Sequence, residues 1–161
     1  MDKDRSDLLC SILRFKLCFC ERNNGAIQKM NTSTADHKVV HYGGCHCGAV
    51  QFEFLAPPNI TVIDCNCSVC SMSGFLHLIV DANDFSLLSG DKILTSYTFN
   101  TQTAQHLFCS SCGIKSFYIP RSHPNAYSVN ARCVKRGSVT RMNIEAFDGV
   151  NWEESIVGLR S

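Results

Sequence analysis

Seven cysteines stand in three short groups, and their number and spacing suit zinc binding. The groups are Cys45-His46-Cys47, Cys65-Asn66-Cys67-Ser68-Val69-Cys70 and Cys109-Ser110-Ser111-Cys112. Zinc in a structural site takes four ligands in a tetrahedron, so seven thiols divide into one closed site and one site that lacks a ligand. The spacing therefore predicts two zinc ions per chain, one of them with a position open to a further ligand.

The two outer pairs are predicted to form the closed site. In extended chain Cys45 and Cys47 would point to the same face, because side chains alternate along a strand. Cys109 and Cys112, followed by Gly113, form a zinc knuckle, in which a tight turn aims two sulfurs at one point and the glycine lets the backbone double back. Such a site would join distant parts of the domain and contribute directly to the free energy of folding.

Cys65, Cys67 and Cys70 remain for the second site, where a single loop would wrap one ion with three sulfurs. Three protein ligands plus an exchangeable one are typical of a catalytic zinc. Three thiolates make zinc a weak activator of water and favour a soft, anionic ligand, so the predicted chemistry involves a substrate thiolate. A fourth protein ligand would instead make this site structural, and the candidates for it are His46, His77, His106 and Cys133.

Two other uses of these thiols fit the sequence less well. The chain holds 11 cysteines among 161 residues, which in a secreted protein would suggest disulfides. The count is odd, however, and two cysteines separated by one residue bridge each other only with strain. A redox role for Cys109 and Cys112 alone would normally come with a βαβ pattern, and the sequence around them shows none.

The elements that would position the thiols are short strands. From Lys38 onward apolar and polar residues alternate, as they do between Ala49 and Leu55, and this is the period of a half-buried strand. Such strands, separated by Gly, Pro, Asn and Asp, indicate an all-β domain. We predict strands at residues 39–42, 49–55, 60–63, 75–80, 85–88, 94–99, 105–108, 116–119, 126–134 and 140–147. Cys133 would be a core thiol on the strand at 126–134.

The length fits one domain, which we place at residues 38–155. Residues 1–37 are predicted to be an N-terminal extension, poorly ordered or helical between Leu8 and Phe19, where apolar residues recur at helical spacing. Its thiols, Cys10, Cys18 and Cys20, are interpreted as unliganded. Residues 156–161 would form a C-terminal tail, and residues 151–159 one short helix.

The net charge of +1 argues against duplex DNA or an anionic membrane surface as a partner. Residues 8–20 are fairly apolar, but Arg14 and Lys16 interrupt them, so they resemble neither a secretory signal nor a membrane span. A cytoplasmic or nuclear protein is therefore expected.

The three cysteine groups and their neighbours resemble the glutathione-dependent formaldehyde-activating enzyme (Gfa) family. The resemblance covers roughly residues 38–155 and lies in Gly43-Gly44-Cys45-His46-Cys47-Gly48-Ala49-Val50, Cys65-Asn66-Cys67-Ser68-Val69-Cys70 and Phe108-Cys109-Ser110-Ser111-Cys112-Gly113. Within that family, residues 97–101, 104–106 and 116–122 are similar to the centromere protein V branch.

This resemblance implies a mainly β, Mss4-like antiparallel domain with two zinc ions. It implies a carbon–sulfur lyase that joins glutathione and formaldehyde to S-hydroxymethylglutathione, or carries out a related small-thiol reaction. Two ligand sets are implied: Cys45, Cys47, Cys109 and Cys112 for the structural zinc, and Cys65, Cys67 and Cys70 for the catalytic zinc.

Other features remain open at this point. Lys115 and Arg121 are candidates for gripping the carboxylates of glutathione, and the alternative is that they are solvated surface charges. A second hypothesis is a non-enzymatic zinc module that binds protein partners in a centromere, chromatin or cytoskeletal role. The N-terminal extension is charge-balanced, and the first proline of the chain is Pro57, beyond the extension. The extension is therefore not the basic, proline-rich segment that could carry such a role.

Overall fold

The computed structural model describes residues 37–159, and these residues form three β-sheets with short helices between them. The strands are β1 (Val39–Gly44), β2 (Gln51–Ala56), β3 (Asn59–Cys65), β4 (Leu76–Asp81), β5 (Phe85–Ser89), β6 (Leu94–Tyr97), β7 (His106–Cys109), β8 (Phe117–Tyr118), β9 (Ala126–Asn130) and β10 (Arg141–Phe147). The α-helices are α1 (Ser68–Ser73) and α2 (Trp152–Ser155), and the 3-10 helices are η1 (Ala82–Asp84), η2 (Asp91–Ile93), η3 (Ala131–Cys133) and η4 (Ile156–Leu159).

These elements match the predicted all-β character and the short C-terminal helix. The helix predicted between Leu8 and Phe19, and the extension that contains it, lie outside the described residues except for His37. No helix within residues 37–159 combines the length and the apolar character that a membrane crossing would need.

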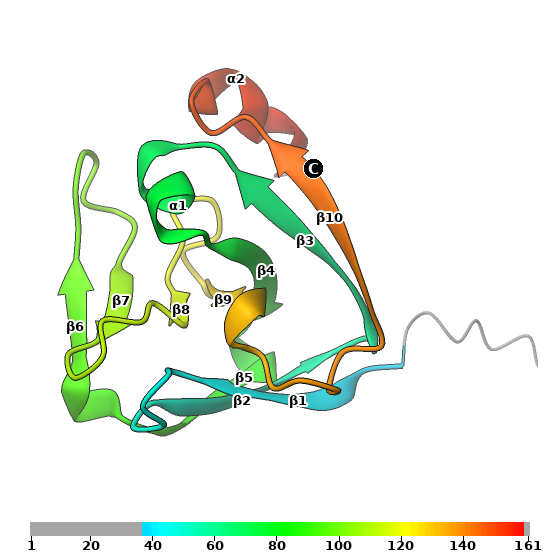
Figure 1. Ribbon diagram of the computed structural model, residues 1–161. Helices are drawn as coiled ribbons and strands as arrows, with labels where there is room; N and C mark the ends of the chain where they lie inside the picture. The colour runs from blue at the N-terminus through cyan, green and yellow to red at the C-terminus, as the bar shows by residue number, and fades with distance from the viewer. Residues whose placement is uncertain (1–36, 160–161) are drawn as a thin grey trace, which may run out of the picture. The chain divides into compact units, whose positions relative to one another are not determined.

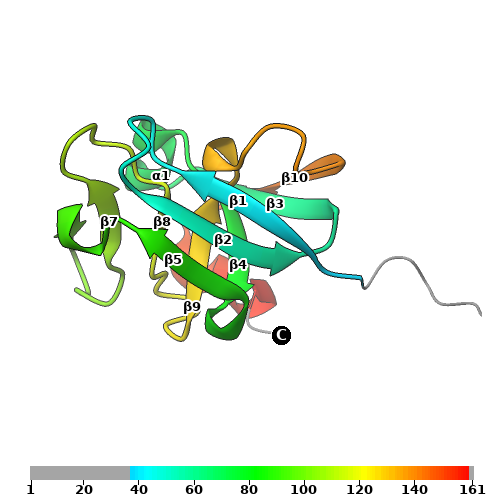
Figure 2. The ribbon, with the colours of Figure 1, turned by 90° about the horizontal axis from the view of Figure 1, so that it is seen from below.

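The core lies between two sheets that face each other. The first has the order β1-β2-β5 and the second the order β10-β3-β4-β9-β8 (Figure 2). The alternation predicted for β2 buries Phe52 and Phe54 and leaves Gln51 exposed. Phe52 stacks on Phe85 within the first sheet, with ring centroids 5.4 Å apart, and meets Phe117 of the second sheet edge-on at 5.5 Å. These aromatic contacts hold the two layers together.

The five-stranded sheet uses its two faces differently. One face sends Val62, Leu78 and Val129 into the core against the first sheet. Because side chains alternate along each strand, the neighbouring residues Ile63 and His77 lie on the opposite face. The cavity described below is lined by residues of that face and by α1, the β6–β7 hairpin and α2. Figure 1 shows where these three segments lie in the fold.

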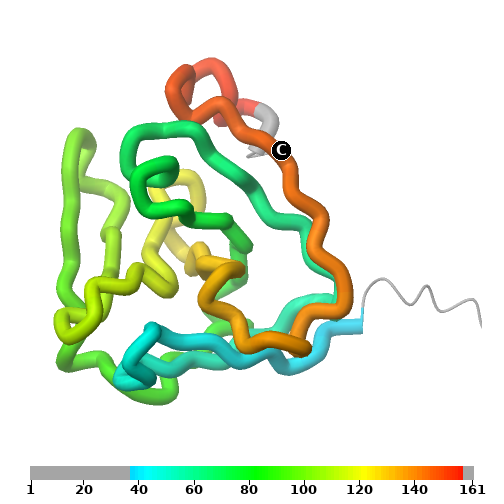
Figure 3. The backbone as a smooth tube through the Cα atoms, viewed as in Figure 1, coloured from blue at the N-terminus to red at the C-terminus, as the bar shows by residue number. Residues whose placement is uncertain are grey.

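One strand pair departs from the antiparallel pattern. β10 runs parallel to β3, in a register that pairs Arg141 with Asn59 and Phe147 with Cys65. After η3 the chain runs back beside the first sheet, where the Lys135 N–H donates to the Tyr42 carbonyl (Figure 3). β10 therefore starts at the same end of the sheet as β3, and the two carboxyl ends meet beside α1.

The strand predicted at 126–134 is too long. β9 ends at Asn130, whose side-chain oxygen accepts a hydrogen bond from the Arg132 N–H at 3.1 Å and so starts the η3 turn. Cys133 consequently lies half-buried in that turn, and the prediction of a core thiol on a strand face is wrong.

Candidate metal centres and the adjoining cavity

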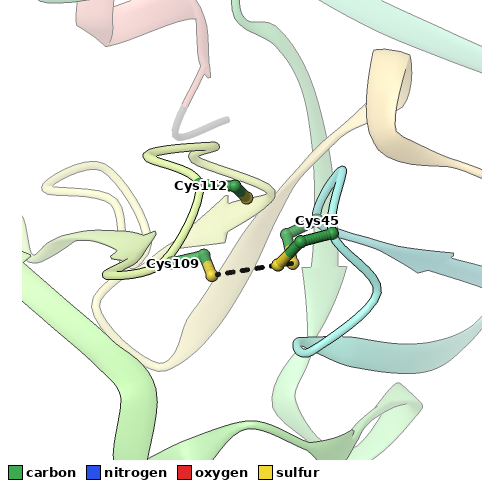
Figure 4. Close-up of side chains that lie close together, drawn as sticks. Cys45, Cys109 and Cys112 are labelled. Carbon is green, nitrogen blue, oxygen red and sulfur yellow. Dashed lines mark hydrogen bonds between the residues drawn. The ribbon is translucent and has the colours of Figure 1, made fainter.

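Four sulfurs from two distant parts of the chain meet in one cluster. The Sγ atoms of Cys45, Cys47, Cys109 and Cys112 all lie within 4.8 Å of one another. Cys47 Sγ is 3.4 Å from Cys45 Sγ and 3.7 Å from Cys109 Sγ, which comes from 62 residues further along the chain. Figure 4 shows how the side chains of Cys45, Cys109 and Cys112 lie close together. Four thiols on facing loops are the donor set of a closed, tetrahedral zinc site.

Each half of this cluster is formed by a tight turn. The structure shows the predicted knuckle: the Gly113 N–H donates to the Cys109 carbonyl at 2.8 Å, and Gly113 has a φ of 73°. The other half was predicted as extended chain, and this prediction is wrong. The chain turns after Cys45, whose carbonyl accepts from the Gly48 N–H at 3.1 Å, and Gly48 has a φ of 78°. Both turns need φ values that favour glycine.

Backbone N–H groups stabilise negative charge on two sulfurs of the four-thiol cluster, those of Cys112 and Cys45. The backbone N–H groups of Cys47 and Ile114 donate to the Cys112 sulfur and lower the pKa of this thiol to about 6. The Val50 N–H likewise donates to Cys45 Sγ at 3.3 Å. Thiolates are the form that binds metal, so these hydrogen bonds prepare the cluster for a cation.

Three further sulfurs form a second cluster at the junction of β3 and α1. The Sγ atoms of Cys65, Cys67 and Cys70 lie within 4.8 Å of one another, with Cys65 at the end of β3, Cys67 as the N-cap residue of α1 and Cys70 buried within α1. Among residues 37–159, no fourth His, Cys, Asp or Glu joins this cluster, and no fifth joins the four-thiol cluster. His46, His77, His106 and Cys133 are therefore outside the second cluster.

The charges of the three thiols are interdependent. The Cys65 and Cys70 thiols donate to the Cys67 sulfur and lower the pKa of Cys67 to about 2. The same interactions raise the pKa of Cys65 and of Cys70, because two more negative sulfurs cannot form beside the first one. The cluster therefore carries one negative charge easily and three only when a cation is present. A soft divalent ion such as Zn²⁺ fits this donor set.

The segment that follows β10 packs against the three-thiol loop. Asn66 donates through its side-chain amide to the Asp148 carboxylate at 3.0 Å, and its amide oxygen accepts from the Val150 N–H at 3.0 Å. Gly149 lies between these contacts, so close to the cluster that a Cβ there would come within 2.9 Å of the Cβ of Cys67. The position of the loop thus depends on a segment about 80 residues away.

A cavity of about 620 Å³ opens beside the three-thiol cluster. All three thiols of that cluster line it, whereas none of the four thiols of the other cluster does. Residues of the five-stranded sheet form another part of its wall, and α1, the β6–β7 hairpin and α2 contribute the rest. The lining includes Ile63, His77, Ile79, Phe99, Asn100, Thr101, Ala104, His106, Tyr118, Arg121, Phe147 and Trp152.

Two buried imidazoles stand in the cavity wall. His77 Nδ1 lies 3.1 Å from Ser128 Oγ and 3.3 Å from the Tyr118 hydroxyl, and His106 Nδ1 lies 3.5 Å from Lys115 Nζ. Neither Nε2 atom has a hydrogen-bond partner among the described residues. Burial lowers the pKa of each imidazole to about 4, so both are neutral at pH 7.

The family of the chain follows from its match to a family model. The model of the glutathione-dependent formaldehyde-activating enzyme matches residues 40–148, a span that holds both cysteine clusters. The chain belongs to this Gfa family. It has the mainly β, Mss4-like fold of that family.

A solved structure supports the assignment of the chain to the Gfa family. A Rhodobacter sphaeroides protein of known crystal structure is 33% identical to the chain and superposes with a TM-score of 0.54. The match covers 65% of this chain and 99% of that protein.

The Gfa match ends at residue 148, and the cavity mouth includes residues beyond it. Trp152 of α2 packs edge-on against Phe147 at 5.7 Å, and the Arg121 guanidinium lies over the Trp152 ring, 4.1 Å from its centroid. Of the two predicted cations, Arg121 lines the cavity, whereas Lys115 lies behind the wall, against the rings of Phe75 and Tyr118. Sequence reasoning missed Trp152, although a lone tryptophan after the last strand is a visible signal.

Proposed function

We propose that the chain is a carbon–sulfur lyase of the Gfa type, which adds a small thiol, glutathione foremost, to formaldehyde or releases it again. One observation carries the proposal. Of two thiol clusters that suit zinc, only the one with three sulfurs opens into a cavity, and that cavity has the size of a small-molecule site. A closed, purely structural pair of sites would need no such cavity.

In this proposal Cys45, Cys47, Cys109 and Cys112 hold a structural zinc, and Cys65, Cys67 and Cys70 hold a second one. Zinc bound at the three thiolates would supply a cation that favours the ionised form of a fourth, incoming thiol. The residues that hold it fit this role, because residues 37–159 offer no fourth ligand at the cluster and the cluster faces the cavity.

Two neutral imidazoles would line the place where the thiol and the aldehyde react. The Lys115 ammonium can only donate, so His106 Nδ1 accepts from it and the ring proton resides on Nε2. When the thiolate sulfur attacks the carbonyl carbon, a C–S bond forms and the π electron pair moves to the oxygen. The oxygen then takes up a proton from water to give the hydroxymethyl thioether, while the neutral imidazoles of His106 and His77, whose Nε2 atoms are buried, keep positive charge out of this part of the cavity wall. The reverse sequence releases formaldehyde.

The resemblance to the centromere protein V branch bears on the same cavity. Residues 97–101, 104–106 and 116–122 carry that resemblance, and they contribute Phe99, Asn100, Thr101, Ala104, His106, Tyr118, Arg121 and Ser122 to its lining. We therefore infer that features shared with this branch set the shape of a small-molecule site. This favours the enzyme over the alternative, a non-enzymatic zinc module that binds protein partners in a centromere, chromatin or cytoskeletal role.

A cytoplasmic or nuclear location belongs to the proposal. All eight cysteines within residues 37–159 are free thiols, and clusters of this kind persist where the environment is reducing.

Exchange NMR with ¹³C-labelled formaldehyde and glutathione would test the proposed reaction. The zinc-loaded protein should speed the exchange between free formaldehyde and the hydroxymethyl adduct, and Cys67→Ser should abolish the acceleration while the protein stays folded. Cys133→Ser is the matched control, because this thiol lies outside both clusters, and it should retain activity. An unchanged exchange rate with the zinc-loaded wild type would refute the lyase and leave the protein-binding module as the better hypothesis.

A further inference from the structure

Arg121 and Glu153 place opposite charges side by side at the mouth of the cavity. Arg121 Nη1 lies 3.6 Å from Glu153 Oε1, and both residues line the cavity. The two side chains differ in exposure: that of Arg121 is 23% exposed, whereas that of Glu153 is 84% exposed. The described residues give Arg121 no other carboxylate within 4.0 Å.

The guanidinium of Arg121 is held in place by a ring rather than by hydrogen bonds. It lies over Trp152, which in turn packs against Phe147 in the cavity wall. Stacking on an aromatic face fixes the plane of the guanidinium and leaves the donors at its edge free for a ligand. An arginine fixed in this way suits a carboxylate, which it can bind through two parallel hydrogen bonds.

The existing ion pair is weak enough to give way to a ligand. It is long for a charged hydrogen bond, and its carboxylate is largely in water, so it contributes little to stability. A ligand that brings both a carboxylate and an ammonium group would replace this one pair with two, and the stacked Arg121 would need no rearrangement.

We infer that Arg121 and Glu153 bind the zwitterionic α-amino-acid end of a thiol peptide whose sulfur reaches the three-thiol cluster. The carboxylate of that end lies against the Arg121 guanidinium, and its ammonium group lies against Glu153. This inference rests on the proposed function, because it assigns the opposite end of the same substrate. Glutathione carries such an end on its γ-glutamyl residue, and simple alkyl thiols do not.

Calorimetric binding of S-methylglutathione to the full-length, zinc-loaded protein tests this subsite without turnover, because this thioether has no sulfur proton to lose. Arg121→Gln should weaken its binding about tenfold, the size expected for one charged hydrogen-bond pair, and Arg121→Lys should restore part of the loss. Acetylation of the ligand's amino group removes its positive charge. It should weaken binding to the wild type, and it should change binding to Glu153→Gln little. Arg136→Gln, at an exposed position outside the cavity, is the control and should bind like the wild type.

Equal binding of S-methylglutathione to the wild type and Arg121→Gln would overturn the inference, as would equal binding of the acetylated and free ligands to the wild type. Kinetics separate this failure from that of the lyase. If exchange is accelerated equally well for glutathione and 2-mercaptoethanol, the lyase stands and the subsite does not. If Arg121→Gln raises KM for glutathione without changing kcat, and leaves the kinetics with 2-mercaptoethanol unchanged, the lyase and the subsite both stand. If the thioether binds through Arg121 but exchange is not accelerated, only the subsite stands.

Discussion

Gly149 lies against the sulfur of Cys65, and a methyl group at this glycine would overlap that sulfur. The two residues come from opposite ends of the domain and are brought together by the parallel pairing of β10 with β3, which sets Phe147 opposite Cys65. The three-thiol cluster is therefore built by its own loop and by the segment that packs over it.

Gly149→Ala should impair the second metal site without removing a ligand. The added methyl group would displace Cys65 Sγ or push the segment away from Cys67, and three sulfurs that no longer converge bind zinc less tightly. We expect metal content to fall from about two ions per chain towards one, with the strand content in circular dichroism unchanged.

Gly137→Ala is the matched control for this prediction. Gly137 has a positive φ of 83°, and no atom outside its chain neighbours lies within 4 Å of the position that its Cβ would take. Its replacement should cost about 1 kcal/mol of backbone strain and leave both metals bound. If the two alanine variants retain equal amounts of metal, the contact between Gly149 and Cys65 has no role in binding.

The cysteine groups and the strands could be predicted from sequence because both are local signals. The alternation in β2 and the spacing of Cys109, Cys112 and Gly113 each depend on a few adjacent residues, and the structure shows the expected strand and knuckle. The turn at Cys45 escaped prediction, because two cysteines with one residue between them converge on one point in either an extended chain or a tight turn.

The cavity could not be predicted, since it depends on pairings between distant segments. No pattern of neighbouring residues indicates that β10 runs parallel to β3, or that the Asn66 side chain forms a hydrogen bond with Asp148, 82 residues away. The end of β9 is a different case: Asn130 carried a recognisable turn signal, but the β-branched and apolar pattern around it favoured a longer strand.

The two clusters should respond differently when they lose a thiol. Cys67→Ser should cost one metal ion and leave the fold intact, because the loop and α1 lie at the edge of the cavity. Cys109→Ser should unfold the domain or lower Tm strongly, since the four-thiol cluster joins segments 62 residues apart and Cys109 itself is fully buried. Metal analysis and thermal melts of both variants measure this, and equal losses of Tm would contradict it.

Asn66→Ala should loosen the second site from outside its ligand set. Asn66 holds the three-thiol loop to Asp148 and Val150, and losing such a supporting contact weakens metal binding by about 10–100-fold. Competition with a chromophoric chelator measures the affinity of the weaker site. Asn83→Ala is the control, because this exposed amide bonds only within its own turn, to Asp81, and both metal affinities should be unchanged. An equal effect of the two variants would count against the role of the contact.

Stability should fall as the pH drops from about 6.5 towards 4, in part because of His77. Burial lowers the pKa of this imidazole to about 4 in the folded chain, against 6.5 in the unfolded one. Within that window the unfolded chain binds a proton that the folded chain does not, so the free energy of unfolding decreases as the pH falls and is fully retained above pH 6.5. Between pH 7 and pH 5 the free energy of unfolding should therefore fall by about 2 kcal/mol more in the wild type than in His77→Gln.

Urea unfolding of both proteins at the two pH values measures this difference, with the metal content checked at each pH so that zinc loss in acid is not mistaken for titration. A second comparison, between pH 7 and pH 8.5, is the control. His77 is neutral in both states there, so wild type and variant should change in parallel. If the wild type and His77→Gln also lose equal stability between pH 7 and pH 5, the imidazole is not held neutral by burial. The pKa of His77 would then be close to 6.5 in the folded chain, and the cavity wall would gain a positive charge as the pH falls below that value.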